Sequence, residues 1–254
     1  MIMESNMKVV FHKDFYQVYT SDPAAEPGRL EAVIQVIEPH VELITPEPAP
    51  EEDIAAVHTP SQIGRVKAQG LYPISSLAAG GAILAAELGL SEPAFALIRP
   101  PGHHASQGSS WGFCYFNNMA VALDRLRRNG RIRKAYVLDF DLHFGDGNVN
   151  ILGKKDWATI FNPDAPSRDV YMREVAHEME RCDADMIGIS AGFDNHEMDW
   201  GGTLKTEDYE EMGQMVRQAA RRVGGGCFAI LEGGYNHRVL GQNVMALLRG
   251  LSSD

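Results

Sequence analysis

The sequence predicts an α/β domain with a central, mostly parallel β-sheet and helices on both of its faces. Short apolar runs recur along the chain, and they are continuous rather than alternating, as expected of strands buried on both faces. Segments with helical periodicity lie between these runs, and alternation of strand and helix is typical of a parallel sheet. The chain shows no linker-like stretch and no repeat, so we predict one domain over residues 1–254.

The individual elements follow from these patterns. Six short runs are rich in β-branched and aromatic residues, which favours strands. Residues 206–223 begin with Thr and Glu and carry charges on one face, as in a solvated amphipathic helix. Residues 46–52 are rich in Pro and Glu and predict a surface loop. The expected strands are 9–11, 94–98, 135–138, 158–161, 186–189 and 227–231, and the expected helices are 77–88, 118–128, 169–181, 206–223 and 239–251.

Composition restricts the classes of function. The chain has 254 residues, of which 44% are hydrophobic, enough for a substantial core. A net charge of −11 opposes a nonspecific electrostatic grip on nucleic acid. We expect no membrane span, because no apolar stretch approaches about 18 residues. The three cysteines form no CxxC pair and the first residues lack a signal-peptide pattern, so we expect reduced thiols and a cytoplasmic protein.

Polar residues and glycine follow four of the expected strands. In a parallel sheet these four strand ends share one edge, and that edge is where open α/β sheets bind their ligands. The sequence therefore predicts one site that gathers histidines, aspartates and a tyrosine. The segments are Arg99-Pro-Pro-Gly-His-His104, the run from Asp139 to Gly147, Ser190-Ala-Gly-Phe-Asp194 and Glu232-Gly-Gly-Tyr235.

The second of these segments has the pattern of a metal site. Asp141 and His143 are two residues apart, so on an extended backbone their side chains leave on the same face. A hydrolytic zinc site needs three protein ligands and an open position for water. Asp194 follows a glycine that lets the chain turn, and it is the natural third ligand. A bound ion of this kind lowers the pKa of water from ~15.7 to about 7 and produces a nucleophile.

The remaining polar residues supply the other groups that hydrolysis needs. His103 and His104 are adjacent, and a general base must take a proton and return it to the leaving group. Asp139 and Asp146 are surplus carboxylates that can orient those imidazoles. Tyr235 follows two glycines that allow close backbone approach, and its phenol can donate a hydrogen bond to an oxyanion.

These segments occur in the order found in the histone deacetylase family, a metal-dependent superfamily that includes acetylpolyamine amidohydrolases and acetoin-utilisation proteins. The resemblance covers nearly the whole chain and implies the fold that deacetylases share with arginases. Five ordered motifs carry it, with weaker likeness in Glu26-Pro-Gly-Arg-Leu30, Val57-His-Thr-Pro60 and the closing helix. The five are Arg99 to His104, Gly112-Phe-Cys-Tyr-Phe-Asn-Asn118, Asp139-Phe-Asp-Leu-His-Phe-Gly145, Ala191-Gly-Phe-Asp194 and Glu232 to Tyr235.

The resemblance implies a role for each catalytic residue. His104, paired with Asp146, would be the general base and then the general acid. His103, paired with Asp139, would be its electrostatic companion. Tyr235 would polarise the scissile carbonyl and stabilise the tetrahedral oxyanion.

The resemblance also implies the ligands and the substrate channel. Asp141, His143 and Asp194 would bind one catalytic Zn²⁺, with Fe²⁺ or another divalent ion as the alternative. Gly112 and Phe113 would line the tunnel that holds the alkyl chain of an acylated amine, and Trp111 is a second candidate for the Phe113 position.

Two departures from the family pattern affect these expectations. Only residues 144–193 separate the Asp-x-His motif from the third ligand, so a glycine- and proline-rich loop that normally supplies a second tunnel wall is largely missing. That loop also completes a K⁺ site near Asp139 and the carbonyls of Asp141 and His143, which leaves K⁺ binding open. Residues 69–75 contain no Asp or Glu, whereas relatives carry an acidic residue there that grips the substrate backbone. We expect a shallow, open site.

Three functions are compared. The first is zinc-dependent removal of an acyl group from acetyl-lysine, an acetylated polyamine or another small amine. The second is arginase-like chemistry, which needs a further Asp two residues after His143, where this chain has Gly145. The third is a non-catalytic metal- or acyl-binding module, which would not need Tyr235 or His104. We predict the first, with a monomer favoured.

Overall fold

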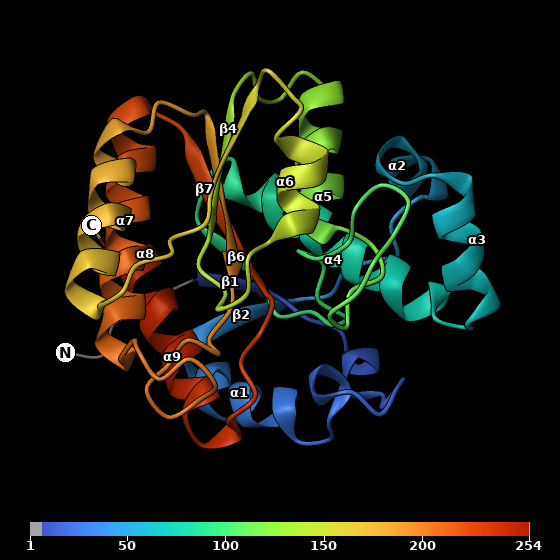
Figure 1. Cartoon of the computed structure of the whole chain (residues 1–254), viewed down its shortest axis with the longest axis horizontal. Helices are drawn as coiled ribbons and strands as arrows, with labels where there is room; N and C mark the ends of the chain where they lie inside the picture. The colour runs from blue at the N-terminus through green and yellow to red at the C-terminus, as the bar shows by residue number, and fades with distance from the viewer. Residues whose placement is uncertain (1–6, 254) are drawn as a thin grey trace.

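The computed structural model describes residues 7–253, so the predicted absence of a signal peptide concerns residues that lie mainly outside the described part. A seven-stranded parallel sheet forms the centre of a single α/β domain, with the strand order β2-β1-β3-β7-β6-β4-β5 (Figure 1). The predicted fold class is therefore confirmed. The strands are β1 (Met7–Val10), β2 (Val41–Ile44), β3 (Ala94–Ala96), β4 (Ala135–Asp139), β5 (Ala158–Phe161), β6 (Met186–Ala191) and β7 (Gly226–Leu231).

The strand order explains how the site is assembled. The chain passes from β3 to β4 across a gap that β6 and β7 later fill, so the order of strands reverses in the middle of the sheet. The four strands that precede the polar segments, β3, β7, β6 and β4, are direct neighbours. Their pairing register aligns Asp139 with Ser190 and Ala191 with Leu231. All four polar segments therefore begin at one edge of the sheet, beside a topological switch point.

Helices cover both faces of the sheet. Helices α4 and α5 pack on one face, whereas α7, α8, α9 and α1 lie on the other side (Figure 1). The helices are α1 (Arg29–Ile37), α2 (Glu51–Val57), α3 (Pro60–Ala68), α4 (Tyr72–Gly89), α5 (Asn118–Arg128), α6 (Asp146–Leu152), α7 (Arg168–Arg181), α8 (Thr206–Val223) and α9 (His237–Leu251), with short 3₁₀ turns at Lys13–Tyr16, Pro23–Ala25 and Glu38–His40.

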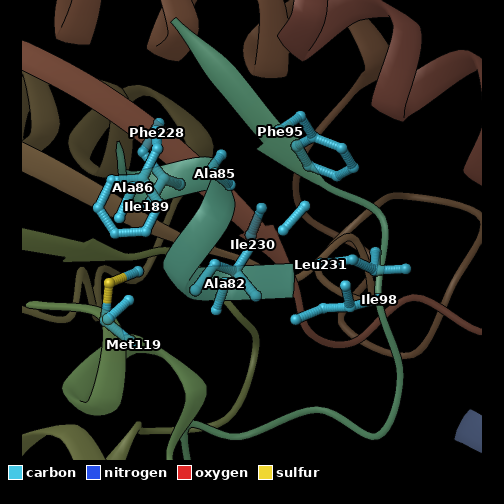
Figure 2. Packing of buried hydrophobic residues seen from close by; sticks show 14 of the residues in the cluster. Ala82, Ala85, Ala86, Phe95, Ile98, Met119, Ile189, Phe228, Ile230 and Leu231 are labelled. Atoms are coloured by element: carbon cyan, nitrogen blue, oxygen red, sulfur yellow. The ribbon is translucent and has the colours of Figure 1, made fainter. Parts of the chain in front are cut away.

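Small side chains let α4 approach the sheet closely. Figure 2 shows Ala82, Ala85 and Ala86 of this helix against residues of β3 and β7. Met119 of α5 lies near Phe228 and Ile189 in the same view. All of these side chains are buried. Larger side chains at these positions would hold α4 away from the sheet. With alanine there, α4 packs closely against β3 and β7, the strands from which two of the site loops leave.

The elements differ from the sequence prediction mainly at short segments. The long helices are close to prediction, and α8 has the predicted bounds. Strand β2, helices α1, α2, α3 and α6, and the 3₁₀ turns were not predicted. The predicted loop 46–52 is wrong at its end, since α2 begins at Glu51. Helix α4 begins five residues before the predicted residue 77, because a Pro in its first turn is compatible with a helix start.

No helix within residues 7–253 combines the length and apolar character that crossing a bilayer would require.

Candidate active site

The three predicted metal ligands converge at the sheet edge. Asp141 and His143 follow β4, and Asp194 follows β6. His143 Nδ1 lies 3.2 Å from Asp141 Oδ1 and 3.1 Å from Asp194 Oδ2. One ligand atom from each of these three residues lies within 4.8 Å of the other two, as a shared metal ion would require. Among residues 7–253, this is the group of three or more His, Cys, Asp or Glu residues that meets this condition.

The charges of this group suit a cation. Burial favours the neutral form of Asp141, but the His103 charge and hydrogen bonds from His143 and Gly233 outweigh burial and lower the pKa of Asp141. Burial and the charge of Asp141 raise the pKa of Asp194 to about 6. Its Oδ2 is buried and makes no hydrogen bond of acceptable geometry. A divalent ion would satisfy this oxygen and neutralise both carboxylates, so the donor set fits a transition metal such as zinc.

The same contacts affect the protonation state of His143. Its hydrogen bond to Asp141 and its close contact with Asp194 raise the pKa of His143 to about 10, although partial burial opposes this. The two carboxylates thereby favour the charged form of the imidazole between them. Metal binding requires a neutral imidazole, so an incoming ion would replace this proton.

Each of the adjacent histidines has its own aspartate. His103 Nδ1 lies 3.3 Å from Asp139 Oδ2, and His104 Nδ1 lies 2.7 Å from Asp146 Oδ1. Asp139 is the last residue of β4 and Asp146 is the first residue of α6. The predicted pairs therefore exist in the fold, although α6 itself was not predicted.

The two histidines have opposite electrostatic surroundings. Burial opposes the charge on His103, but Asp141 and Asp139 outweigh burial and raise its pKa well above the usual value. Burial and the neighbouring charge of His103 lower the pKa of His104 to about 4, against the opposing effect of Asp146. These surroundings favour a neutral His104 that can accept a proton at pH 7, and they favour the charged form of His103.

The loop after β7 places Tyr235 over the same site. Burial, followed by the charge of Asp141, raises the pKa of Tyr235, so its phenol stays protonated and can donate. Asp199 Oδ2 accepts hydrogen bonds from the main-chain N–H groups of Tyr235 and Asn236, at 2.8 and 2.7 Å. The buried Arg29 donates to the carbonyls of Glu232 and Gly234 on the other side of this loop. These contacts fix the backbone from which the phenol extends.

A pocket of about 110 Å³ opens onto these groups. Both predicted tunnel residues, Gly112 and Phe113, line it. Each has a left-handed backbone, with φ of 56° and 67°, and for Phe113 this is a strained conformation. At Gly112 a Cβ atom would overlap the His104 ring, so only glycine fits beside the base. The full lining is Pro101, His103, His104, Trp111, Gly112, Phe113, His143, Trp200, Gly233 and Tyr235.

The sequence prediction missed several residues that build this pocket. Trp200 stacks on Tyr235 with ring centroids 4.1 Å apart, and it supplies an aromatic wall from the loop after β6. Asp199 and Arg29 hold the tyrosine loop but lie far from it in sequence. The sequence marked them only by their position in or near a motif. Asp199 lies five residues after Asp194, and Arg29 belongs to the Glu26–Leu30 segment.

The segment that follows β5 also contacts the site. Asn162, which follows β5, accepts a hydrogen bond from the main-chain N–H of Gly145 at 2.8 Å. Asp139 Oδ1 and Asn148 Oδ1 are buried without hydrogen-bond partners near this position. Potassium binding stays a prediction.

Comparisons with known proteins agree with this architecture. The family model described as the histone deacetylase domain matches residues 24–163 and 161–251. The two matched segments join at the end of β5, within the region where the family loop is largely missing from this sequence. A probable deacetylase of Methanothermobacter thermautotrophicus is 29% identical over 97% of this chain and 91% of its own length. A histone deacetylase-like amidohydrolase of Pseudomonas aeruginosa is 28% identical, over 88% and 74%.

A solved structure, the crystal structure of the HDA15 HD domain, has the same fold. Its TM-score is 0.83 over 98% of this chain and 90% of its own length, at 22% identity. Together with the family match over most of the chain, the comparisons settle the family. This chain belongs to the histone deacetylase family.

Proposed function

We propose that this protein is a metal-dependent amidohydrolase that removes an acetyl or other short acyl group from the nitrogen of an acylated amine. The observation that supports it most is the combination of an Asp-His-Asp group, whose histidine lines the pocket, with a neutral His104 and a protonated Tyr235 in the same pocket. These are a set of metal ligands, a base and an oxyanion donor, the three elements of metal-assisted amide hydrolysis.

Asp141, His143 and Asp194 would hold the ion, with zinc as the first choice from this donor set. When bound, it would supply a Lewis acid that acidifies water and polarises the acyl carbonyl. His104 takes a proton from the attacking water, and Asp146 holds its Nδ1 and stabilises the imidazolium that forms. His104 then gives the proton to the departing amine.

Tyr235 and His103 stabilise charge in the site and do not carry the proton that His104 transfers. Tyr235 donates its phenolic hydrogen to the carbonyl oxygen as negative charge develops there. His103 lies against Asp141, with Nε2 at 3.7 Å from Oδ1, and its positive charge would act next to a carboxylate that holds the ion. Trp111, Phe113 and Trp200 surround the entrance and hold the alkyl part of the amine away from water.

Arginase-like chemistry with two metals is not favoured. The position where a further carboxylate would be needed is Gly145, and a Cβ atom there would overlap Asp139 Oδ2. The fold has filled this space with the carboxylate that pairs with His103. A non-catalytic binding module would not require a base and a phenol at the same pocket.

A direct assay tests the proposal. The purified chain, stripped with chelator and reloaded with Zn²⁺ or Fe²⁺, is screened against acetyl-lysine peptides, acetylated polyamines and other small acylated amines. We expect turnover that disappears with chelator, and a fall of roughly 10²–10³ in kcat for Tyr235→Phe with metal content unchanged. Tyr136→Phe, whose hydroxyl bonds to Glu178 away from the site, is the matched control and should keep full activity. Chelator-insensitive turnover, or a Tyr235→Phe variant as active as the control, would contradict the proposal.

A further inference from the structure

Trp111 makes contacts that lining a pocket does not explain. Its side chain is 56% exposed, yet its indole Nε1 donates to both oxygens of Asp146, at 3.1 and 3.0 Å. Its ring also lies on His104, with centroids 3.8 Å apart and an angle of 31° between the planes. One side chain therefore contacts both members of the His104–Asp146 pair.

Both hydrogen bonds converge on the Asp146 carboxylate, which is the only acceptor of the three groups in these contacts. Trp111 donates to the carboxylate, and the carboxylate accepts from His104 Nδ1 at 2.7 Å through the same Oδ1 atom. An indole N–H only donates, so it cannot compete with Asp146 for the imidazole proton. A third of the Asp146 side chain is exposed, and a carboxylate in that position has other rotamers available. The two indole contacts oppose such a rotation.

The stacked ring has a second consequence. Asp146 stands in the first turn of α6, a helix of only seven residues, so the helix alone gives it little support. The indole covers one face of the His104 ring, whereas His103 lies against it with centroids 4.0 Å apart. The two neighbouring rings thereby restrict the tilt of the imidazole, which lines the pocket.

We propose that Trp111 is a positioning residue for the His104–Asp146 pair, which it holds in register for proton transfer. The inference rests on the proposed function, because it assigns Trp111 to the base of that reaction. Trp200, the other exposed tryptophan of the pocket, contacts Tyr235 and His143 instead. The two tryptophans therefore serve different catalytic groups.

A double-mutant cycle separates this role from a structural one. Trp111→Phe keeps an aromatic ring and removes the N–H donor, and we expect kcat to fall roughly ten- to a hundredfold, with KM changed much less. In an Asp146→Asn background the same substitution should cause little further loss, because the pair it serves is already broken. Trp157→Phe, on the connection between α6 and β5, is the matched control and should leave kcat unchanged. A rise in KM alone, or the same fractional loss in both backgrounds, would overturn the proposal.

Spectroscopy tests the contact without relying on turnover. The chain has three tryptophans, so ¹⁵N-labelled protein gives three indole N–H resonances that Trp111→Phe and Trp157→Phe assign. We expect Asp146→Asn to shift the Trp111 resonance and leave that of Trp157 in place. If the wild-type protein hydrolyses no acylated amine, the proposed function fails, and with it the catalytic role of Trp111. A Trp111 resonance that has the same position in wild type and in Asp146→Asn overturns the inference, even where turnover of the wild-type protein is normal.

Discussion

His103 and His104 are adjacent in sequence and their ring centroids lie 4.0 Å apart, yet they favour opposite protonation states. His103 faces Asp139 and Asp141, which favour its charged form, whereas burial and then the charge of His103 lower the pKa of His104 to about 4. The charge on one imidazole therefore adds to burial in favouring the neutral form of the other. Two neighbouring histidines with separate aspartates provide a fixed charge and a free base in one place.

This pairing predicts that His104 is the group whose loss most affects proton transfer. His104→Ala should lower kcat by roughly 10²–10⁴, the usual contribution of a positioned acid–base group. Added imidazole should restore part of the rate, because the side chain leaves a space beside Asp146. Steady-state kinetics with and without imidazole measure both effects. His177→Ala, on an exposed position of α7, is the control; a His104→Ala variant with wild-type kcat would refute the assignment.

The sequence could predict that the three proposed ligands converge, because the sheet largely determines where they lie. Parallel strands whose ends carry Asp141, His143 and Asp194 must deliver them to one edge, whatever the loops do. Trp200 and Asp199 were missed because their roles come from loop geometry, and no periodicity encodes the approach of two loops. Strand β2 was missed because its burial is only partial at an outer edge of the sheet, so its pattern lacks the continuous apolar run of β6 or β7.

Gly112 gives a prediction about space beside the base. Gly112→Ala and Gly130→Ala both force alanine into a left-handed backbone, which costs about 1–2 kcal/mol of folding stability in each case. Only at Gly112 does the new Cβ meet His104, whereas nothing lies near it at Gly130. A displacement of about 1 Å at a catalytic group can cost ~10²-fold in rate. Thermal melting should show that Gly112→Ala is destabilised at least as much as Gly130→Ala, because the overlap with His104 adds to the backbone strain. Activity assays should show a loss of kcat for Gly112→Ala alone, and equal activities would contradict the contact.

Metal binding should raise the free energy of unfolding of the chain. With free Zn²⁺ at about 100 times its Kd, the folded state gains ~2.7 kcal/mol, which for a chain of this size raises Tm by roughly 5–10 °C. Asp194→Asn removes a buried ligand oxygen and should abolish this shift. Asp183→Asn, an exposed carboxylate paired with Lys134, should keep it. Differential scanning calorimetry with metal and with chelator checks the result, and a Tm shift that survives Asp194→Asn would exclude this residue as a ligand.

His58 connects pH to stability at a place remote from the metal ligands. Its Nε2 accepts the N–H of Asn117 at 2.8 Å, and its Nδ1 lies 3.1 Å from the carbonyl of Ser106. The side chain thus joins the loop after β3 to the start of α5. Burial lowers the pKa of His58 to about 4. In the unfolded chain this histidine takes up a proton near pH 6.5, whereas in the folded chain it remains neutral until about pH 4.

The sign of the effect follows directly. Between pH 6.5 and 4 the unfolded state binds more protons, so the free energy of unfolding falls as the pH falls through this window. For His58 alone the loss is roughly 2 kcal/mol at pH 5. His58→Gln keeps a donor and an acceptor but does not titrate. Urea unfolding at pH 8 and pH 5, with chelator in both so that metal release does not contribute, should therefore show a smaller acid-induced loss for His58→Gln than for wild type. The exposed control His177→Gln should behave as wild type, and an equal loss in all three proteins would mean that His58 is already protonated in the folded chain.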